Sequence, residues 1–138
     1  MIMVYNENYK ERLINIGKQY DLDFENKFLI DSYIIYLYVE NNEVLGFLII
    51  EETIDESGIV LLYVDKNSRR QKIASYLLDY FISDKTFTKA RILLEVSNNN
   101  EAAINLYDKF GFKTINVRKK YYKDGSDALI MERMVLHE

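Results

Sequence analysis

Apolar residues along this chain follow two spacings, and each spacing predicts a different kind of element. Continuous apolar runs predict β-strands that are buried in a sheet. These runs are Tyr33–Val39, Val44–Ile50 and Ile59–Val64. Ile92–Val96, in which Glu95 interrupts the apolar residues, predicts a further buried strand. The run Ile59–Val64 is bounded by Gly58 and Asp65, and we expect a strand there that is covered on both faces.

Apolar residues three and four positions apart predict helices elsewhere in the chain. This spacing occurs in Tyr9 to Tyr20, which Asn6 or Asn8 can cap, in Ile73 to Phe81, and in Glu101 to Phe110, which Asn98 to Asn100 can cap. Gly111 ends the last of these helices. The segment Asp21–Ile30 predicts a second short helix after the first.

The remaining elements are short strands and turns. They are an edge strand at Ile2–Tyr5, a hairpin turn at Asn41 to Glu43, a polar turn at Thr53–Ser57, and two final strands at Phe112–Arg118 and Ala128–Leu136 around a Lys123 to Gly125 turn. The predicted order is βααβββαβαββ. This order predicts an α/β (α+β) fold with a mixed sheet, formed by one domain over residues 1–138.

The stretch from Gly58 to Phe81 is a strand, a basic loop and an amphipathic helix in succession. The loop Lys66–Lys72 holds four of the 18 basic residues, and Ser68 and Gln71 match a helix-capping pattern. Unpaired amides and positive charge in one place favour an anion, most often a phosphate. The same residues also fit an ordinary crossover with a solvated loop. Because the loop has no glycine, it is neither a Walker loop nor a Rossmann fingerprint.

Composition excludes several other classes of site. A formal charge of −4 argues against a general nucleic-acid binder. The absence of cysteine removes a thiol nucleophile and a disulfide framework, and His137 is the only histidine, so we expect no metal centre. The longest apolar run is too short to span a bilayer and no signal segment precedes the fold, so we expect no membrane contact and a cytoplasmic protein.

The motifs of this chain resemble those of a known family. Val64 followed by Arg69-Arg70-Gln71-Lys72-Ile73-Ala74 resembles motif A of the GNAT acetyltransferases, a loop that holds coenzyme A. The later motifs resemble the RimI branch, the ribosomal-protein N-terminal alanine acetyltransferases. They are Leu94-Glu95-Val96, Asn98 to Tyr107, Gly111-Phe112, Arg118 to Tyr122 and Asp127 to Met131.

The resemblance implies a coenzyme A site in the Gly58 to Phe81 stretch. It assigns the pyrophosphate to backbone amides of Arg70, Gln71, Lys72, Ile73, Ala74 and Ser75, with added charge from Arg69. It places Leu62, Tyr63 and Val64 beside the pantetheine arm, and Asn100 either against the cofactor or simply as a helix cap.

Lys72 stands where the family usually has glycine. A position that needs a positive φ disfavours lysine, whereas an ordinary helical backbone would let the side chain add a cation. We favour the helical backbone at Lys72.

The resemblance also implies a pair of catalytic residues. Glu95 matches the branch's general base, and the other reading is a salt-bridge partner at an exposed edge. Tyr107 matches the tyrosine that protonates the leaving thiolate, and the other reading is core packing. An α-amino group, with a pKa of about 8 against about 10.4 for lysine, needs little help to lose its proton.

We therefore expect an N-acetyltransferase that uses acetyl-CoA as cosubstrate and transfers the acetyl group directly. The expected acceptor is a protein N-terminus, namely the alanine of a ribosomal protein. The alternatives are a small amine, a lysine side chain, or a coenzyme A-binding regulatory module without turnover. The branch usually has a Pro-Trp segment near its first helices, and this chain has neither residue. We expect a monomer or dimer.

Overall fold

The protein is described by a computed structural model that places residues 1–30, 32–69, 71–84, 86 and 89–135. Seven strands and three α-helices are joined by three shorter helical turns in this part of the chain. In chain order the elements are β1 (Ile2–Val4), η1 (Glu7–Tyr9), α1 (Lys10–Tyr20), η2 (Phe24–Phe28), β2 (Tyr33–Glu40), β3 (Glu43–Glu52), β4 (Glu56–Val64), η3 (Lys66–Ser68), α2 (Ile73–Ser83), β5 (Arg91–Ser97), α3 (Glu101–Lys109), β6 (Lys113–Arg118) and β7 (Ala128–Met134).

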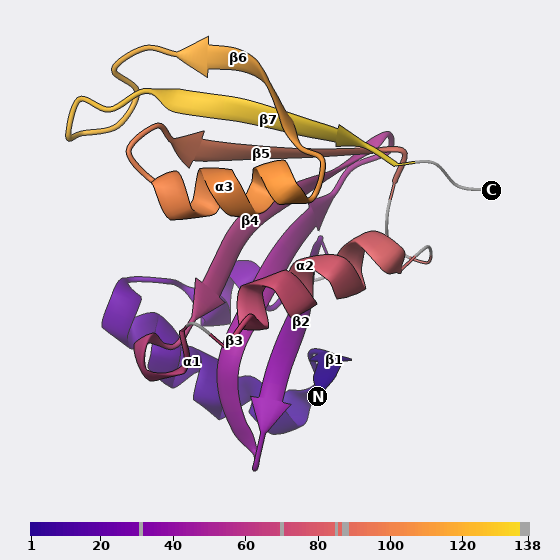
Figure 1. Ribbon diagram of the computed structural model, residues 1–138. Coiled ribbons are helices and arrows are strands. Elements are labelled where there is room, and N and C mark those ends of the chain that lie inside the picture. The colour runs from indigo at the N-terminus through magenta and orange to yellow at the C-terminus, as the bar shows by residue number, and fades with distance from the viewer. Residues whose placement is uncertain (31, 70, 85, 87–88, 136–138) are drawn as a thin grey trace.

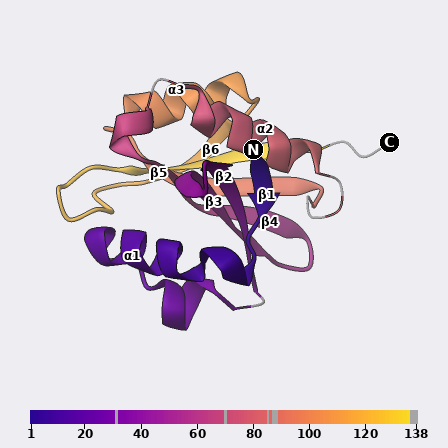
Figure 2. The same ribbon diagram turned by 90° about the horizontal axis from the view of Figure 1, so that it is seen from below.

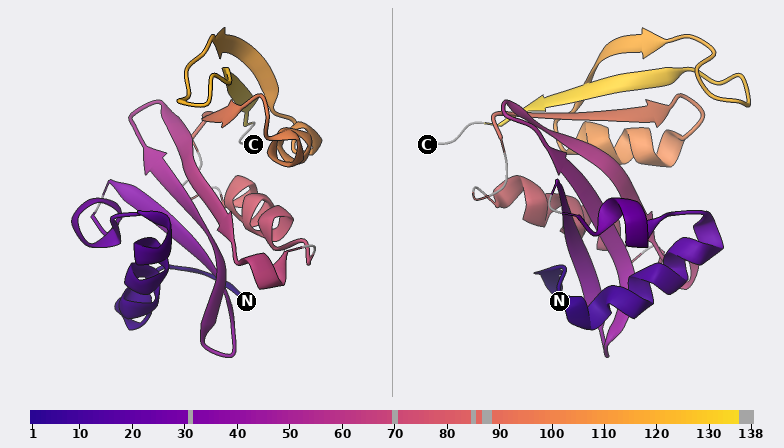
Figure 3. Two further views of the ribbon diagram at one scale, coloured as in Figure 1. Left: turned by 90° about the vertical axis from the view of Figure 1, so that its left-hand side faces the viewer. Right: turned by 180° about the vertical axis from the view of Figure 1, so that it is seen from behind.

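The strands form one mixed sheet in the order β1-β2-β3-β4-β5-β7-β6. Neighbouring strands are antiparallel except for β4 and β5, which are parallel and connected through α2. The views in Figures 1, 2 and 3 show α1 and η2 on one face of the sheet, and α2 and α3 on the other. The sheet is therefore the middle of three layers.

Each face of the sheet has its own hydrophobic core, because the side chains of β3 alternate between the two faces. Leu48 and Ile50 pack with the cluster under α2 and α3, whereas Phe47 and Ile49 pack with the cluster under α1 and η2. All four side chains are fully buried. A continuous apolar run is what a strand buried on both faces requires.

The predicted order of elements is confirmed, and the two-residue hairpin turn is among its best-defined features. Asn41 and Asn42 both have positive φ, 50° and 63°, as a tight turn between β2 and β3 requires. The second short helix is a single turn, Phe24–Phe28, capped by the side chain of Asp23. The predicted end of the last strand, at Leu136, lies outside the described residues.

One burial prediction is wrong. Strand β4 is not covered on both faces, because Val60 is 41% exposed and the residues after it are only partly buried. On α2, Ile73, Leu77, Leu78 and Phe81 are buried, whereas Tyr76 and Tyr80 are exposed. The two tyrosines flank the buried stripe of α2 and contact aromatic residues of β2.

Gly46 of β3 allows the beginning of α2 to lie close to the sheet. A Cβ atom at this position would lie 2.8 Å from the Tyr63 carbonyl oxygen and 3.0 Å from the Ile73 side chain. Such distances are too short for any larger residue without movement of β4 or α2. None of the helices in the described part of the chain is long and apolar enough to cross a membrane.

Candidate active site

The candidate site is an opening in the sheet where β4 and β5 separate. Their parallel pairing runs from Glu56 opposite Arg91 to Ile59 opposite Leu94, and does not continue beyond. Strand β4 also shifts register against β3 at this point, between Leu61 and Ile59. The backbone of Leu62 to Val64 therefore lies at an open edge, which is the reason that the second half of β4 is only partly buried.

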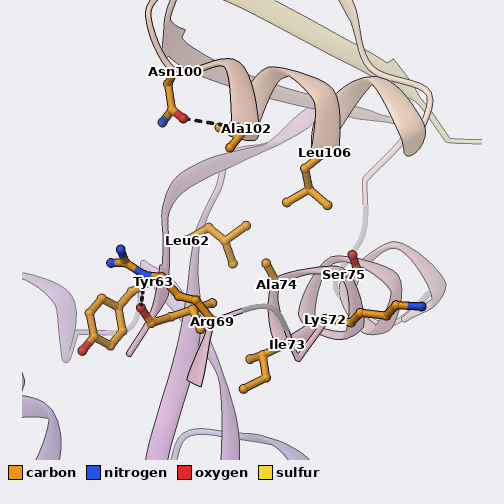
Figure 4. Close-up of a pocket in the computed structure, with 12 residues that line it drawn as sticks. Leu62, Tyr63, Arg69, Lys72, Ile73, Ala74, Ser75, Asn100, Ala102 and Leu106 are labelled. Atoms are coloured by element: carbon orange, nitrogen blue, oxygen red, sulfur yellow. Dashed lines mark hydrogen bonds between the residues drawn. The ribbon is translucent and has the colours of Figure 1, made fainter. Parts of the chain in front are cut away.

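A cleft of about 590 Å³ occupies the opening, between the first turns of α2 and α3 (Figure 4). It is lined by Leu62, Tyr63, Val64, Arg69, Lys72, Ile73, Ala74, Ser75, Asn100, Ala102, Ala103 and Leu106. Nine of the predicted cofactor residues are among them. Gln71 is exposed and does not line the cleft, and Arg70 lies outside the described residues.

The loop that enters α2 differs from the sequence prediction. Lys72 has φ 62° and ψ 22°, a left-handed conformation, so the expected helical backbone at this residue is wrong. For a residue other than glycine this conformation costs roughly 1–2 kcal/mol. The predicted Ser68–Gln71 cap is also wrong, since Ser68 is buried in the turn η3 and α2 has no side-chain cap.

The beginning of α2 offers the cleft backbone donors that have no hydrogen-bond partner among the described residues. The first helical hydrogen bond runs from the Tyr76 amide to the Lys72 carbonyl, so the amides of Ile73, Ala74 and Ser75 precede the hydrogen-bonded part of the helix. The first turn of α2 has no acidic residue. These amides and the helix dipole together favour an anion.

The side chains around this cleft suit the same kind of ligand. None of the described residues that line it is acidic, and Arg69 and Lys72 contribute positive charge. The Arg69 side chain is fixed by a hydrogen bond of 3.2 Å from its Nε to the Val64 carbonyl. The cleft thus suits a ligand with an anionic group near the beginning of α2 and an apolar part along Leu62.

Asn100 caps α3 at the opposite wall of the cleft. Its Oδ1 accepts a hydrogen bond of 3.2 Å from the Ala103 amide (Figure 4). Asn100 is therefore a helix cap, as one of the two interpretations predicted. Its contact with a cofactor stays a prediction. Ala102, Ala103 and Leu106 also line this wall, and sequence reasoning missed them, although the spacing of one helical face was the available signal.

A second cavity, of about 330 Å³, lies beside the cleft at the separation of β4 and β5. It shares Leu62, Asn100 and Ala103 with the cleft. Glu95 and Tyr107 line it, so the structure brings the two predicted catalytic residues together. Tyr122 lines it as well, from the loop between β6 and β7.

Tyr107 of α3 is 7% exposed and packs edge-on against Phe112, with 5.6 Å between ring centroids. Burial raises the pKa of Tyr107 to about 12. Its hydroxyl makes no hydrogen bond with any of the described residues. A buried phenol of this kind keeps its proton throughout the neutral range.

Glu95 projects from β5 on the face opposite α3, because Leu94 and Val96 beside it face the core. Its side chain is 39% exposed, and its Oε1 lies 3.2 Å from Nη1 of Arg118. Glu95 thus has the ion pair that the alternative reading predicted, while it still lines the second cavity. Burial and the negative charge of Glu95 raise the pKa of Tyr122, which indicates how near the two side chains are.

No group of three or more acidic, histidine or cysteine side chains is placed to hold a metal ion among the described residues. The arrangement therefore offers anion-binding amides at one end of an opening, and a carboxylate and a protonated phenol at the other. A carboxylate can accept a proton and a phenol can donate one.

Comparison with known proteins identifies the class of enzyme. A model of the acetyltransferase (GNAT) domain matches residues 31–114. The chain is 32% identical over 105 residues to [Ribosomal protein bS18]-alanine N-acetyltransferase of Escherichia coli K12, covering 73% of this chain and 71% of that protein. It is 30% identical over 112 residues to an N-alpha-acetyltransferase of Saccharolobus solfataricus, covering 71% and 67%.

Solved structures agree with these matches. The ribosomal-protein-S18-alanine N-acetyltransferase of E. coli superposes with a TM-score of 0.83 at 25% identity, covering 100% of this chain and 96% of that one. An aminoglycoside 6'-N-acetyltransferase complexed with coenzyme A reaches 0.82 at 14% identity, covering 100% and 98%, which shows the fold alone. The family match, the relatives and the fold together are those of an N-acetyltransferase. The chain belongs to the GNAT acetyltransferase family.

Proposed function

We propose that this protein transfers the acetyl group of acetyl-CoA directly to the N-terminal amine of a protein. The observation that carries the proposal is that the cleft at the beginning of α2 shares Leu62, Asn100 and Ala103 with the cavity lined by Glu95 and Tyr107. The names of its relatives, which act on ribosomal-protein alanine or on α-amines, support the same class of acceptor.

The cosubstrate is held in the cleft between α2 and α3. The amides of Ile73 to Ser75 bind its diphosphate, Arg69 and Lys72 add positive charge, and the open edge of β4 at Leu62 to Val64 accompanies its apolar arm. When bound, acetyl-CoA supplies an acetyl group activated as a thioester. Free amides at the β4 edge stabilise negative charge that develops on the carbonyl oxygen.

Glu95 and Tyr107 divide the proton transfers between them. Glu95 accepts the proton of the acceptor amine, directly or through a water molecule. The Tyr107 hydroxyl holds the proton that the departing sulfur needs, and its raised pKa keeps that proton in place until then. The chain has no cysteine to carry an acyl group, which supports direct transfer.

An N-terminal amine suits a carboxylate base of this kind. Its pKa of about 8 leaves a useful neutral fraction near pH 7, whereas lysine at about 10.4 does not. Tyr122 lines the acceptor side of the opening, and Tyr121 packs against it with ring centroids 5.2 Å apart. These rings form an apolar wall for the first residues of a polypeptide.

The test is acetylation of defined peptides by the purified full chain with acetyl-CoA. One peptide begins with alanine and continues as the host's own ribosomal protein bS18 does, and its control carries the same residues with a blocked N-terminus and an added lysine. We expect thiol release and a single acetyl group on the first peptide alone. Turnover with the blocked peptide or with a polyamine, and not with the first peptide, would show that the acceptor is a lysine side chain or a small amine and not an N-terminus. A rise in melting temperature with coenzyme A, without turnover of any amine, would overturn the proposal.

A further inference from the structure

The ion pair between Arg118 and Glu95 spans three strands of the sheet. Glu95 is on β5 and Arg118 is at the end of β6, with β7 between them (Figure 1). In the register of the sheet, Glu95 lies opposite Ile130 and Arg118 lies opposite Ala128. The arginine therefore reaches diagonally over β7 to put Nη1 at 3.2 Å from Oε1 of Glu95.

Ala128 makes this reach possible. It lies directly opposite both Arg118 and Ser97, and paired residues on neighbouring strands direct their side chains to the same face. Ala128 is fully buried. A longer side chain at this position would stand in the path of the guanidinium.

The guanidinium is also held on its other side. Its carbon lies 5.4 Å from the centroid of the Tyr121 ring, a cation–π arrangement. Tyr121 in turn contacts Tyr122, which lines the same cavity as Glu95. Arg118 is thus fixed between the carboxylate and the loop that forms the acceptor wall.

This ion pair contributes little to folding, because its side chains are 52% and 39% exposed. The ion pair instead fixes the orientation of the Glu95 carboxylate. Arg118 engages Oε1 only, and no described residue hydrogen bonds to Oε2. One oxygen is therefore anchored and the other is left for a ligand in the cavity.

We propose that Arg118 is a positioning residue for the acetyl transfer: it holds Glu95 in the orientation that accepts the proton of the acceptor amine. This inference rests on the proposed function and adds a residue to it. The arginine also offsets the charge of Glu95. An isolated carboxylate stabilises the ammonium form of a nearby amine, and an ammonium group cannot attack the thioester. A carboxylate that is paired with an arginine stabilises the ammonium form less. Both effects act on the rate of transfer and not on the binding of acetyl-CoA.

The test compares Arg118→Gln and Arg118→Lys with the wild-type full chain, and includes the same changes in a Glu95→Gln background. We expect Arg118→Gln to lower kcat by about 10- to 100-fold, with the KM for acetyl-CoA and the melting temperature unchanged, and Arg118→Lys to recover part of the loss. In the Glu95→Gln background, Arg118→Gln should have no further effect, because residues that act as a unit are not additive.

Arg91 provides a matched control. It lies at the other end of β5 and pairs with Glu56 and Glu132, far along the strands from the cavity. Arg91→Gln removes the same charge and should leave kcat unchanged. An equal loss for Arg118→Gln with and without Glu95 would overturn the positioning role alone. A wild-type chain without turnover on any amine would overturn the proposed function and this inference with it.

Discussion

The hydroxyl of Ser97 donates a hydrogen bond of 2.9 Å to the hydroxyl of Ser126, and so ties the turn after β5 to the loop before β7. Ser126 is buried and donates in turn to Asp124 at 2.6 Å. Beside them, the Asp127 amide donates to the Asn98 side chain at 3.1 Å. The turn that leads into Asn100 and the loop that carries Tyr122 are therefore one hydrogen-bonded unit.

Replacing Ser126 by alanine should loosen this unit. The change removes the hydroxyl between Ser97 and Asp124, and should lower the free energy of unfolding by about 1 kcal/mol, or roughly 3–5 °C in melting temperature. The KM for the acceptor should rise more than that for acetyl-CoA, because Tyr122 of this loop lines the cavity of Glu95 and does not line the cleft at α2. Ser83→Ala, at an exposed helix end, is the control that should change neither value. If the KM for the acceptor is unchanged in Ser126→Ala, the loop does not contribute to acceptor binding.

Replacing Tyr107 by phenylalanine should lower kcat by about 10²-fold, in line with the contribution of a general acid. The ring still packs against Phe112, so the fold and the coenzyme A-dependent rise in melting temperature should be retained. Tyr80→Phe removes a hydroxyl from an exposed tyrosine of α2 and should have no effect on turnover. Wild-type turnover in Tyr107→Phe would exclude its hydroxyl from the reaction.

Stability should fall at alkaline pH because of the same hydroxyl. The pKa of Tyr107 is about 12 in the folded protein against 10.0 for the free side chain. Between these values the folded state binds more protons than the unfolded chain. The contribution of Tyr107 to the free energy of unfolding is therefore fully present below about pH 10. It is lost as pH rises toward 12, by about 2–3 kcal/mol at most. Urea unfolding at about pH 9 and pH 11.5 measures the fall. The free energy of unfolding should fall less between these two pH values in Tyr107→Phe than in wild type. An equal fall in both proteins would show that other tyrosines, such as Tyr63, cause the loss of stability.

Replacing Lys72 by glycine should stabilise the protein by roughly 0.5–1 kcal/mol, because glycine adopts the left-handed conformation without strain but costs more chain entropy. Lys72→Ala also loses the charge but retains the Cβ, so it should not gain this stability. Coenzyme A should bind to the glycine variant at least as tightly as to the alanine variant, measured by calorimetry. A glycine variant less stable than wild type would contradict the left-handed backbone at this position.

Adding a single methyl group at Gly46 should disturb the cofactor end of the site. Its Cβ would lie 2.8 Å from the Tyr63 carbonyl oxygen, so Gly46→Ala should cost about 1–3 kcal/mol and weaken coenzyme A binding by displacing β4 or α2. Gly58→Ala is the matched control on β4, because a Cβ atom at Gly58 would lie 3.8 Å from its nearest neighbour, the Glu51 carbonyl oxygen. Equal stability of the two variants would show that the sheet can absorb the methyl group.

Sequence periodicity was sufficient for the order of elements. Buried strands and amphipathic helices must repeat apolar residues at spacings of their own geometry, and the runs at Tyr33–Val39 and Val44–Ile50 obey this rule. The hairpin at Asn41 and Asn42 was predictable for a related reason, since few residues tolerate positive φ. The motif from Val64 to Ala74 likewise predicted an anion site, because the backbone amides and basic side chains of such a site come from consecutive residues.

What the sequence by itself determined are therefore the features set by neighbours in the chain: the elements, most of their ends, and the family. Tertiary structure decided the rest. Lys72 takes a left-handed backbone at the point where α2 begins close to Gly46 of the sheet, and no local pattern contains that arrangement. Val60 is exposed because β4 leaves β5 there. Arg118 meets Glu95 only because β7 lies between β5 and β6, and strand order is a property of the assembled sheet.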